Sequence, residues 1–257
     1  MKIITLIISL ILAPYFMMAQ ENVTNKPQVI AHRGYWDAEK SAQNSLTALK
    51  MAQEIDIYGS ELDINLTKDG ELIVCHGPKE GDIQNVQYAN FSDVSKVSLK
   101  NGEKVPTLKQ YLKLGKKDKK TILILELKPH DNAAIENEVV KKTIKLVKKY
   151  RMQRQVEFIS FSFHICKELS KLMKDSKIAY LGGDLSPKQI KEAGLTGIDY
   201  NIAVFDKNPN WVKEAQDLGL TVNVWTVSKK EDLMKVIDMG VDYITTNDPL
   251  LAKQLCR

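Results

Sequence analysis

The stretch that decides the fold is residues 121–150, TILILELKPHDNAAIENEVVKKTIKLVKKY. Its first part is almost wholly aliphatic and β-branched, which is typical of a strand buried on both faces in a parallel sheet. Apolar side chains then follow at helical spacing, at Ile135, Val139, Ile144 and Val147, with lysines between them. That pattern predicts an amphipathic helix. A strand followed by such a helix is the repeating unit of α/β proteins.

The same unit recurs on both sides of this stretch. The predicted strands are Val29–His32, Tyr58–Asn65, Thr121–Lys128, Val156–Ser162, Lys177–Leu181, Gly197–Tyr200, Thr221–Thr226 and Tyr243–Thr246. The predicted helices are Ser45–Glu54, Thr107–Leu114, Ala134–Tyr150, His164–Asp175, Pro187–Glu192, Asn210–Leu218, Lys229–Met239 and Pro249–Leu255. Eight strands, each followed by a helix, predict a single (β/α)₈ TIM barrel. An open doubly wound sheet is the alternative, and the absence of a Gly-rich loop after the first strand disfavours it.

One segment interrupts the pattern. After the second strand an apolar run, Leu72–His76, is followed by a polar stretch that we interpret as a short insertion, at about residues 77–103. A loop of this length in a compact domain is usually functional or has structure of its own. It leaves the C-terminal end of a barrel strand, where such enzymes carry their active sites.

The N-terminus is typical of an exported protein. Lys2 precedes the apolar run Ile3–Leu12, and then come Pro14 and the small residue Ala19. A membrane anchor is the alternative, but about ten apolar residues fall short of the roughly 20 that span a bilayer. We therefore predict a signal peptide over residues 1–19, a barrel domain over 20–257, and a periplasmic or secreted protein without a stable membrane span.

Charge and cysteine content exclude some other classes. The net charge is +5, and the lysines gather at 116–120 and 141–149, on what we interpret as a solvated helix face. We therefore expect no nucleic-acid partner. Cys75, Cys166 and Cys256 are too widely spaced for a zinc or redox motif. The oligomeric state stays open.

Carboxylates stand where barrel strands should be apolar. Glu61 and Asp63 end the second strand, and Glu126 and Lys128 end the third. Because side chains alternate along a strand, each pair points to one face. Buried carboxylates need a cation, and oxygen ligands alone suit Mg²⁺ or Ca²⁺ better than zinc. We predict one divalent cation bound by Glu61, Asp63 and Glu126, with surface salt bridges as the plainer alternative.

Two histidines close neighbouring apolar runs. His32 follows Val29–Ala31, and His76 follows Leu72–Cys75. A free imidazole titrates near neutral pH, so one can accept a proton while the other donates one. Arg33 has the planar fork that binds phosphate oxygens. Together with Lys128 and the metal, these groups indicate phosphoryl chemistry.

These residues resemble the glycerophosphodiester phosphodiesterase family over nearly the whole chain. The ordered motifs are Ala31-His32-Arg33-Gly34, Glu61-Leu62-Asp63, His76, Glu126-Leu127-Lys128, the strand 222–227 and the segment 240–246. The resemblance implies metal-dependent hydrolysis of glycerophosphodiesters to an alcohol and glycerol phosphate. It implies that His32 and His76 are the general acid and base, that Glu61, Asp63 and Glu126 bind the metal, and that Arg33 and Lys128 contact phosphate. By the same resemblance Trp225 lines the alcohol pocket; a packed aromatic at the rim is the alternative.

The chain departs from the family pattern at two positions. Gln43-Asn44 stands where the family has Glu-Asn, with the Glu on the metal, and Gly77 stands where Asp usually follows the second histidine. A Gln43 carbonyl can still bind Mg²⁺ or Ca²⁺, but without charge. Two further functions stay open: a phospholipase C-like or lyase enzyme that forms a cyclic phosphate, and a non-catalytic phosphodiester-binding barrel.

Overall fold

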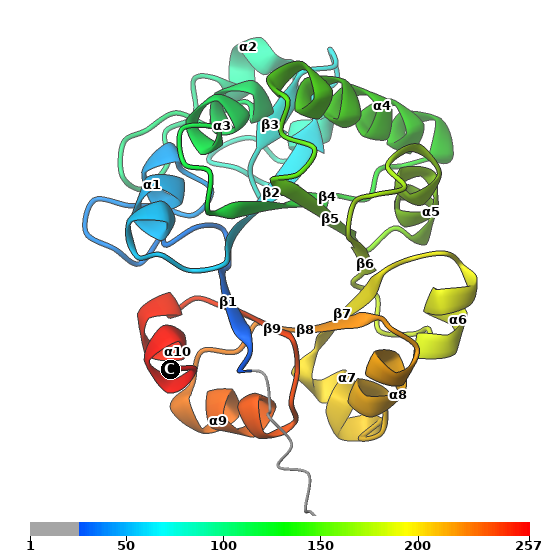
Figure 1. Ribbon diagram of the computed structural model, residues 1–257. Helices are drawn as coiled ribbons and strands as arrows, with labels where there is room; N and C mark the ends of the chain where they lie inside the picture. Colours follow the sequence, from blue (N-terminus) through cyan, green and yellow to red (C-terminus); the bar gives the residue numbers. More distant parts are fainter. Residues whose placement is uncertain (1–25) are drawn as a thin grey trace, which may run out of the picture.

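A computed structural model describes residues 26–257 of the chain. The predicted signal peptide lies outside the described residues. Eight parallel strands form a closed ring, seen end-on in Figure 1: β1 (Gln28–Ala31), β2 (Gly59–Leu66), β4 (Ile122–Leu127), β5 (Val156–Ser160), β6 (Ile178–Tyr180), β7 (Gly197–Asn201), β8 (Thr221–Trp225) and β9 (Tyr243–Thr246). β1 pairs with both β9 and β2 and so closes the sheet. The predicted TIM barrel is confirmed.

Helices surround this ring (Figure 1). They are α1 (Leu46–Glu54), α3 (Leu108–Gly115), α4 (Ala133–Tyr150), α5 (Phe163–Leu172), α6 (Pro187–Glu192), α7 (Ile202–Lys207), α8 (Trp211–Asp217), α9 (Lys230–Asp238) and α10 (Pro249–Leu255). α4 shows why they form: Asn132 caps its first turn by accepting hydrogen bonds from two backbone N–H groups, and its apolar side chains Val139, Ile144 and Val147 are buried. Burial of such a stripe stabilises a helix more than its intrinsic propensity does.

The structure differs from the sequence-based assignment in one helix of the barrel. α7, between β7 and α8, was not expected, because six residues are too few for helical periodicity to be read. It begins where the Asn201 side chain accepts a hydrogen bond from the backbone N–H of Ala203. Such a cap satisfies one of the free donors of the first turn.

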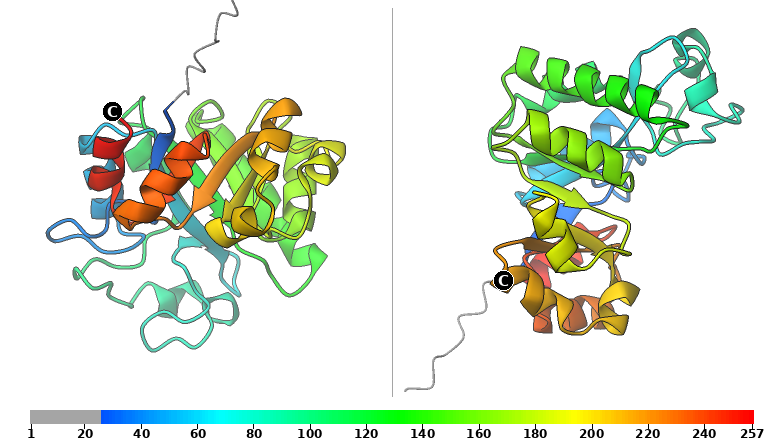
Figure 2. Two further views of the ribbon diagram at one scale, coloured as in Figure 1. Left: turned by 90° about the horizontal axis from the view of Figure 1, so that it is seen from below. Right: turned by 90° about the vertical axis from the view of Figure 1, so that its right-hand side faces the viewer.

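The segment after β2 has structure of its own. β3 (Leu72–Val74) pairs antiparallel with β2, and the 3₁₀-helix η1 (Val86–Tyr88) and α2 (Phe91–Val94) follow. These elements bury a small separate core that contains Cys75 and Val86. Figure 2 shows the segment standing out from one end of the barrel. It therefore forms a wall beside the barrel mouth.

No helix within residues 26–257 combines the length and the apolar character that crossing a bilayer requires.

Candidate active site

Three carboxylates meet at the C-terminal end of the barrel. Glu61 and Asp63 come from β2 and Glu126 from β4, and one oxygen of each lies within 4.8 Å of the others. Strand register produces this arrangement, because Asp63 is directly opposite Glu126 in the parallel pair. All three residues are buried. We call them the carboxylate cluster.

Asp63 is the member of the cluster with the most partners. Lys128 donates to its Oδ1 at 2.9 Å, and the Arg33 Nε lies 3.3 Å from its Oδ2. Asn44 donates to Oδ2 at 2.8 Å and accepts from the Asp63 backbone N–H. Burial opposes ionisation, but Lys128, Arg33 and Asn44 outweigh it and hold the pKa of Asp63 at about 2. Asp63 is therefore ionised at every physiological pH.

Glu61 and Glu126 lack comparable compensation. Glu61 accepts a 2.7 Å hydrogen bond from the Arg33 backbone N–H at Oε2, while its Oε1 is buried without a partner. Burial and its acidic neighbours raise the pKa of Glu61 well above its usual range. Burial and Asp63 also raise the pKa of Glu126, to about 7, although Lys128 contacts it at 2.6 Å. A buried oxygen without a donor, among ligands that are all oxygens, fits a hard divalent cation.

The turn after β1 delivers Arg33 to this cluster. Arg33 has a positive φ of 56°, which aims its backbone N–H at Glu61 while its guanidinium reaches Asp63. Gly34 follows with φ 78°, and a Cβ there would lie 2.6 Å from the Ala48 side chain. Only glycine suits that position. The His-Arg-Gly sequence is thus explained by local backbone geometry.

Gln43 contacts the arginine that lies beside the cluster. Its Oε1 accepts a 2.7 Å hydrogen bond from Arg33 Nη1, and its side chain is exposed. In this structure the amide therefore orients the guanidinium, and the cluster consists of carboxylates alone.

His32 is held in one tautomer. Its Nδ1 lies 2.8 Å from the Oδ1 of Asn247, the same atom that accepts from the Trp36 indole N–H at 3.2 Å. An indole N–H only donates, so the shared atom is an oxygen and His32 Nδ1 must carry a proton. Its Nε2 is left unprotonated. Burial and the adjacent Arg33 lower the pKa of His32 to about 4, so the ring is neutral at pH 7.

A cavity of about 150 Å³, which we call the inner cavity, adjoins the cluster. Both histidines, Arg33 and Lys128 line it together with Glu61 and Glu126, and an apolar wall faces them. Trp225 belongs to that wall: its indole N–H donates to the Asp199 carbonyl at 2.8 Å, and its ring meets Phe161 edge-on at 5.5 Å. Trp225 is thus both a cavity wall and a packed aromatic.

His76 is an accessible residue of the site. It is exposed and follows β3, outside the ring of parallel strands. Partial burial lowers the pKa of the His76 imidazole, and the positive charge of Lys128 also lowers it. His130, by contrast, donates from Nδ1 to the Lys128 carbonyl and accepts the Leu66 N–H at Nε2. Its role is to hold the chain beside Lys128.

Sequence reasoning missed several residues that orient the site. Asn247 follows the last strand and has no sequence signal beyond that position. Asn44, in the loop between β1 and α1, belongs to the Gln-Asn pair, but its contact with Asp63 was not foreseen. Asp199, in the middle of β7, also escaped notice; its Oδ1 is buried without a partner, and burial raises its pKa to about 8. The sequence signal for Asp199 was its charge within a parallel strand, where apolar residues are expected.

Comparison with known proteins agrees with this geometry. Residues 32–251 match the Glycerophosphoryl diester phosphodiesterase family. The protein belongs to this family and is a phosphoric diester hydrolase of the glycerophosphodiester phosphodiesterase class. A glycerophosphodiester phosphodiesterase of Caldanaerobacter subterraneus subsp. tengcongensis is 31% identical to it over 240 residues, which cover 87% of this chain and 95% of the relative.

Solved structures are similar over the same region. The crystal structure of a glycerophosphodiester phosphodiesterase from Parabacteroides distasonis has 42% identity and a TM-score of 0.88, covering 90% of this chain and 97% of that one. An Oleispira antarctica phosphodiesterase, solved with the product sn-glycerol-3-phosphate, has 20% identity and a TM-score of 0.76 over 89% of this chain and 96% of its own. That second likeness shows the fold alone.

Proposed function

We propose that this protein hydrolyses glycerophosphodiesters to an alcohol and glycerol phosphate, with one divalent cation at the carboxylate cluster and with His32 and His76 moving the protons. The observation that carries the proposal is the inner cavity, in which two imidazoles and the cationic side chains of Arg33 and Lys128 lie beside the buried carboxyl groups of Glu61 and Glu126. A phosphodiester fits this cavity because Arg and Lys bind its two free oxygens.

In this proposal His32 is the general base. Its Nε2 has the free lone pair, because Asn247 accepts the proton on Nδ1. The base removes one proton from the attacking water as the water oxygen forms a bond to phosphorus. Neutrality at pH 7 supports the role, since a protonated ring could not accept that proton.

His76 is then the general acid. As the ester bond from phosphorus to the leaving oxygen breaks, His76 gives that oxygen a proton, and an alcohol departs. Its exposure lets it recover a proton from solvent. An anionic diester beside the ring raises the pKa of the imidazole and favours the protonated form.

Glu61, Asp63 and Glu126 would hold the cation, which we propose to be Mg²⁺ or Ca²⁺. Such an ion, when bound, neutralises charge on the phosphate oxygens during the displacement. Lys128 and Arg33 add positive charge from the protein itself and stay in place through contacts of 2.9 Å and 3.3 Å to Asp63.

We further propose that residues 1–19 are a signal peptide and that the barrel, residues 20–257, acts in the periplasm or outside the cell. The layout of Lys2, the apolar run and Ala19 supports this proposal. N-terminal sequencing of the protein recovered from the periplasm or medium tests it. A mature protein that still begins at Met1 would contradict it.

The test of catalysis uses the purified protein with glycerophosphocholine or glycerophosphoethanolamine. Glycerol phosphate should appear with Mg²⁺ or Ca²⁺ and stop on chelation, and His32→Ala or His76→Ala should each lower kcat by about 100-fold or more. His164→Ala, outside the inner cavity, is the matched control. A cyclic phosphate detected by phosphorus NMR would favour the lyase alternative, and calorimetric binding without turnover would favour the non-catalytic one.

A further inference from the structure

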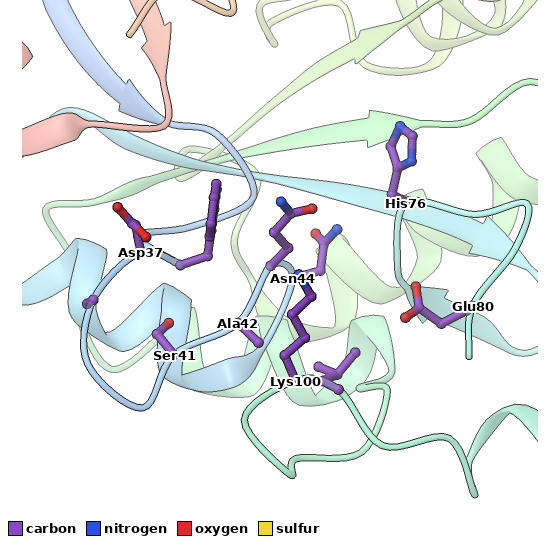
Figure 3. A pocket seen from close by; sticks show the side chains of 11 residues that line it. Asp37, Ser41, Ala42, Asn44, His76, Glu80 and Lys100 are labelled. Atoms are coloured by element: carbon purple, nitrogen blue, oxygen red, sulfur yellow. The ribbon is translucent and has the colours of Figure 1, made fainter. Parts of the chain in front are cut away.

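A second, larger cavity adjoins the inner one. It measures about 370 Å³ and lies between the loop that joins β1 to α1 and the segment that follows β3. We call it the outer cavity. Figure 3 shows Asp37 at the left of this cavity, Asn44 and Lys100 in the middle, and His76 and Glu80 at the right. Of the residues that line the two cavities, His76 alone belongs to both.

This arrangement separates the two arms of a diester. With its phosphate at Arg33 and Lys128, a bound diester would place one ester arm in the inner cavity, whose apolar wall includes Trp225. This arm would then be the one that stays on the phosphate, whereas the family resemblance puts Trp225 beside the alcohol. The other arm passes His76 and enters the outer cavity. The oxygen that joins this second arm to phosphorus is then the one next to His76, so the outer cavity receives the alcohol that leaves.

Glu80 is the distinctive group of the outer cavity. It lies in a tight turn, in which its backbone exchanges two 3.0 Å hydrogen bonds with Ile83. The side chain is half-buried, and in the described part of the chain its carboxylate has neither a hydrogen bond nor an ion pair. Burial raises its pKa, Arg33 opposes the rise, and Asp63 adds to it. Arg33 is already paired with Asp63 and Gln43.

The other walls favour a positive ligand. Trp36 contributes an indole that is fixed by its hydrogen bond to Asn247, and an indole face attracts cations. Asp37 and Lys100 are both exposed at the rim, where their opposite charges offset each other. The half-buried carboxylate of Glu80 is therefore the charge of the outer cavity that no opposite charge balances. A partly desolvated carboxylate gains from a cationic partner.

We propose that the outer cavity is the leaving-group site and that Glu80 selects alcohols that carry an ammonium group. This inference rests on the proposed hydrolysis of glycerophosphodiesters. It adds a specificity determinant from the segment after β3, a part of the chain outside the (β/α)₈ ring.

The experiment compares two substrates that differ in charge. One is glycerophosphoethanolamine, and the other has a neutral 2-hydroxyethyl group in place of the aminoethyl group. In Glu80→Gln the ratio of kcat/KM for the charged over the neutral diester should fall about fivefold, as expected for loss of one partly exposed ion pair. The fall should lie mainly in KM, because Glu80 contacts the head group and not the reacting bond.

Two further variants sharpen the result. Glu39→Gln makes the same chemical change at an exposed position outside the cavity and should leave the ratio as it is. Lys100→Gln removes a competing positive charge and should raise the ratio. An unchanged ratio in Glu80→Gln, or an equal loss on both substrates, overturns the inference. Absence of turnover on either substrate by the unaltered protein would instead contradict the proposed function.

Discussion

At the scale of single residues, the site depends on hydrogen bonds that decide where protons reside. Asn247 fixes His32 by accepting from its Nδ1, and Trp36 fixes Asn247 by donating to the same oxygen. An amide can orient the ring without adding charge. The low pKa of His32, about 4, therefore persists, because burial and Arg33 dominate it.

Replacing the amide by a carboxylate tests this account. In Asn247→Asp the added negative charge should raise the pKa of His32, since it favours the imidazolium. A base works only when unprotonated, so the acid limb of kcat/KM should move to higher pH by about one unit. A pH–rate profile measures the shift. Asn90→Asp, an exposed change of the same kind, should leave the limb in place.

Asp199 yields a prediction about stability. Burial raises its pKa from 3.8 to about 8. Below the unfolded value both states hold the proton, and between the two values only the unfolded state releases it, so folded stability falls as pH rises through that window. Asp199→Asn should therefore stabilise the protein by about 1–3 kcal/mol above pH 8 and much less near pH 4. Urea unfolding at both pH values measures this, and equal gains at both would contradict the account.

At the scale of elements, parallel register builds the carboxylate cluster. Asp63 of β2 lies directly opposite Glu126 of β4, and Glu61 is two residues earlier on the same face of β2. The turn that follows β1 places Arg33 beside the cluster. The strands bring like charges together more closely than the surrounding cations can balance, because the Glu61 Oε1 has no donor.

This imbalance predicts the effect of metal on unfolding. Mg²⁺ or Ca²⁺ at 100 times its dissociation constant should stabilise the protein by roughly 2.7 kcal/mol, and chelation should reverse the gain. Glu61→Gln should raise the Tm of the metal-free protein, because burial and its acidic neighbours disfavour ionisation of the Glu61 carboxyl, and should lose most of the metal-dependent gain. Thermal unfolding with and without the ion measures both effects.

The control for that experiment is Glu71→Gln, since Glu71 lies outside the carboxylate cluster. It should keep the full metal-dependent shift. If Glu61→Gln also kept it, the cation would have to bind elsewhere.

At the scale of the whole molecule, one end of the barrel carries stabilising contacts and the other carries the candidate active site. The N-terminal end is closed by a polar cluster: Lys177 donates to Tyr58 at 2.8 Å and to Tyr243 at 2.7 Å and pairs with Glu157 at 2.9 Å. The two tyrosine rings pack 4.9 Å apart. The C-terminal end carries both cavities and the segment that stands out in Figure 2. Stability and chemistry are thus spatially separated.

That separation predicts the behaviour of Lys177→Met. Loss of the ion pair should lower the free energy of unfolding by about 1 kcal/mol, a modest value because the lysine is partly exposed. kcat/KM should stay unchanged at temperatures where the protein is folded, since Lys177 lies at the opposite end from His32. Lys188→Met, on the exposed face of α6, should alter neither quantity. A large fall in kcat/KM would show that the two ends are coupled.

Local sequence determined the alternation of strands and helices and therefore the barrel, because hydrophobic periodicity is a property of neighbours along the chain. It also indicated Glu61, Asp63 and Glu126, since charge inside a buried strand is unusual and register is regular. Bounds agreed to within a few residues, and the miss was α7, which is too short to show a period.

Only tertiary structure decided which groups orient that chemistry. His32 and Asn247 are 215 positions apart, and the barrel brings them together by closing β1 against β9. Gln43, predicted as a possible ligand, accepts a hydrogen bond from Arg33 that no local pattern indicates. Glu80 comes to the mouth through a turn whose direction no local pattern specifies. Such contacts depend on the three-dimensional path of the whole chain, whereas periodicity and strand register are encoded in short stretches.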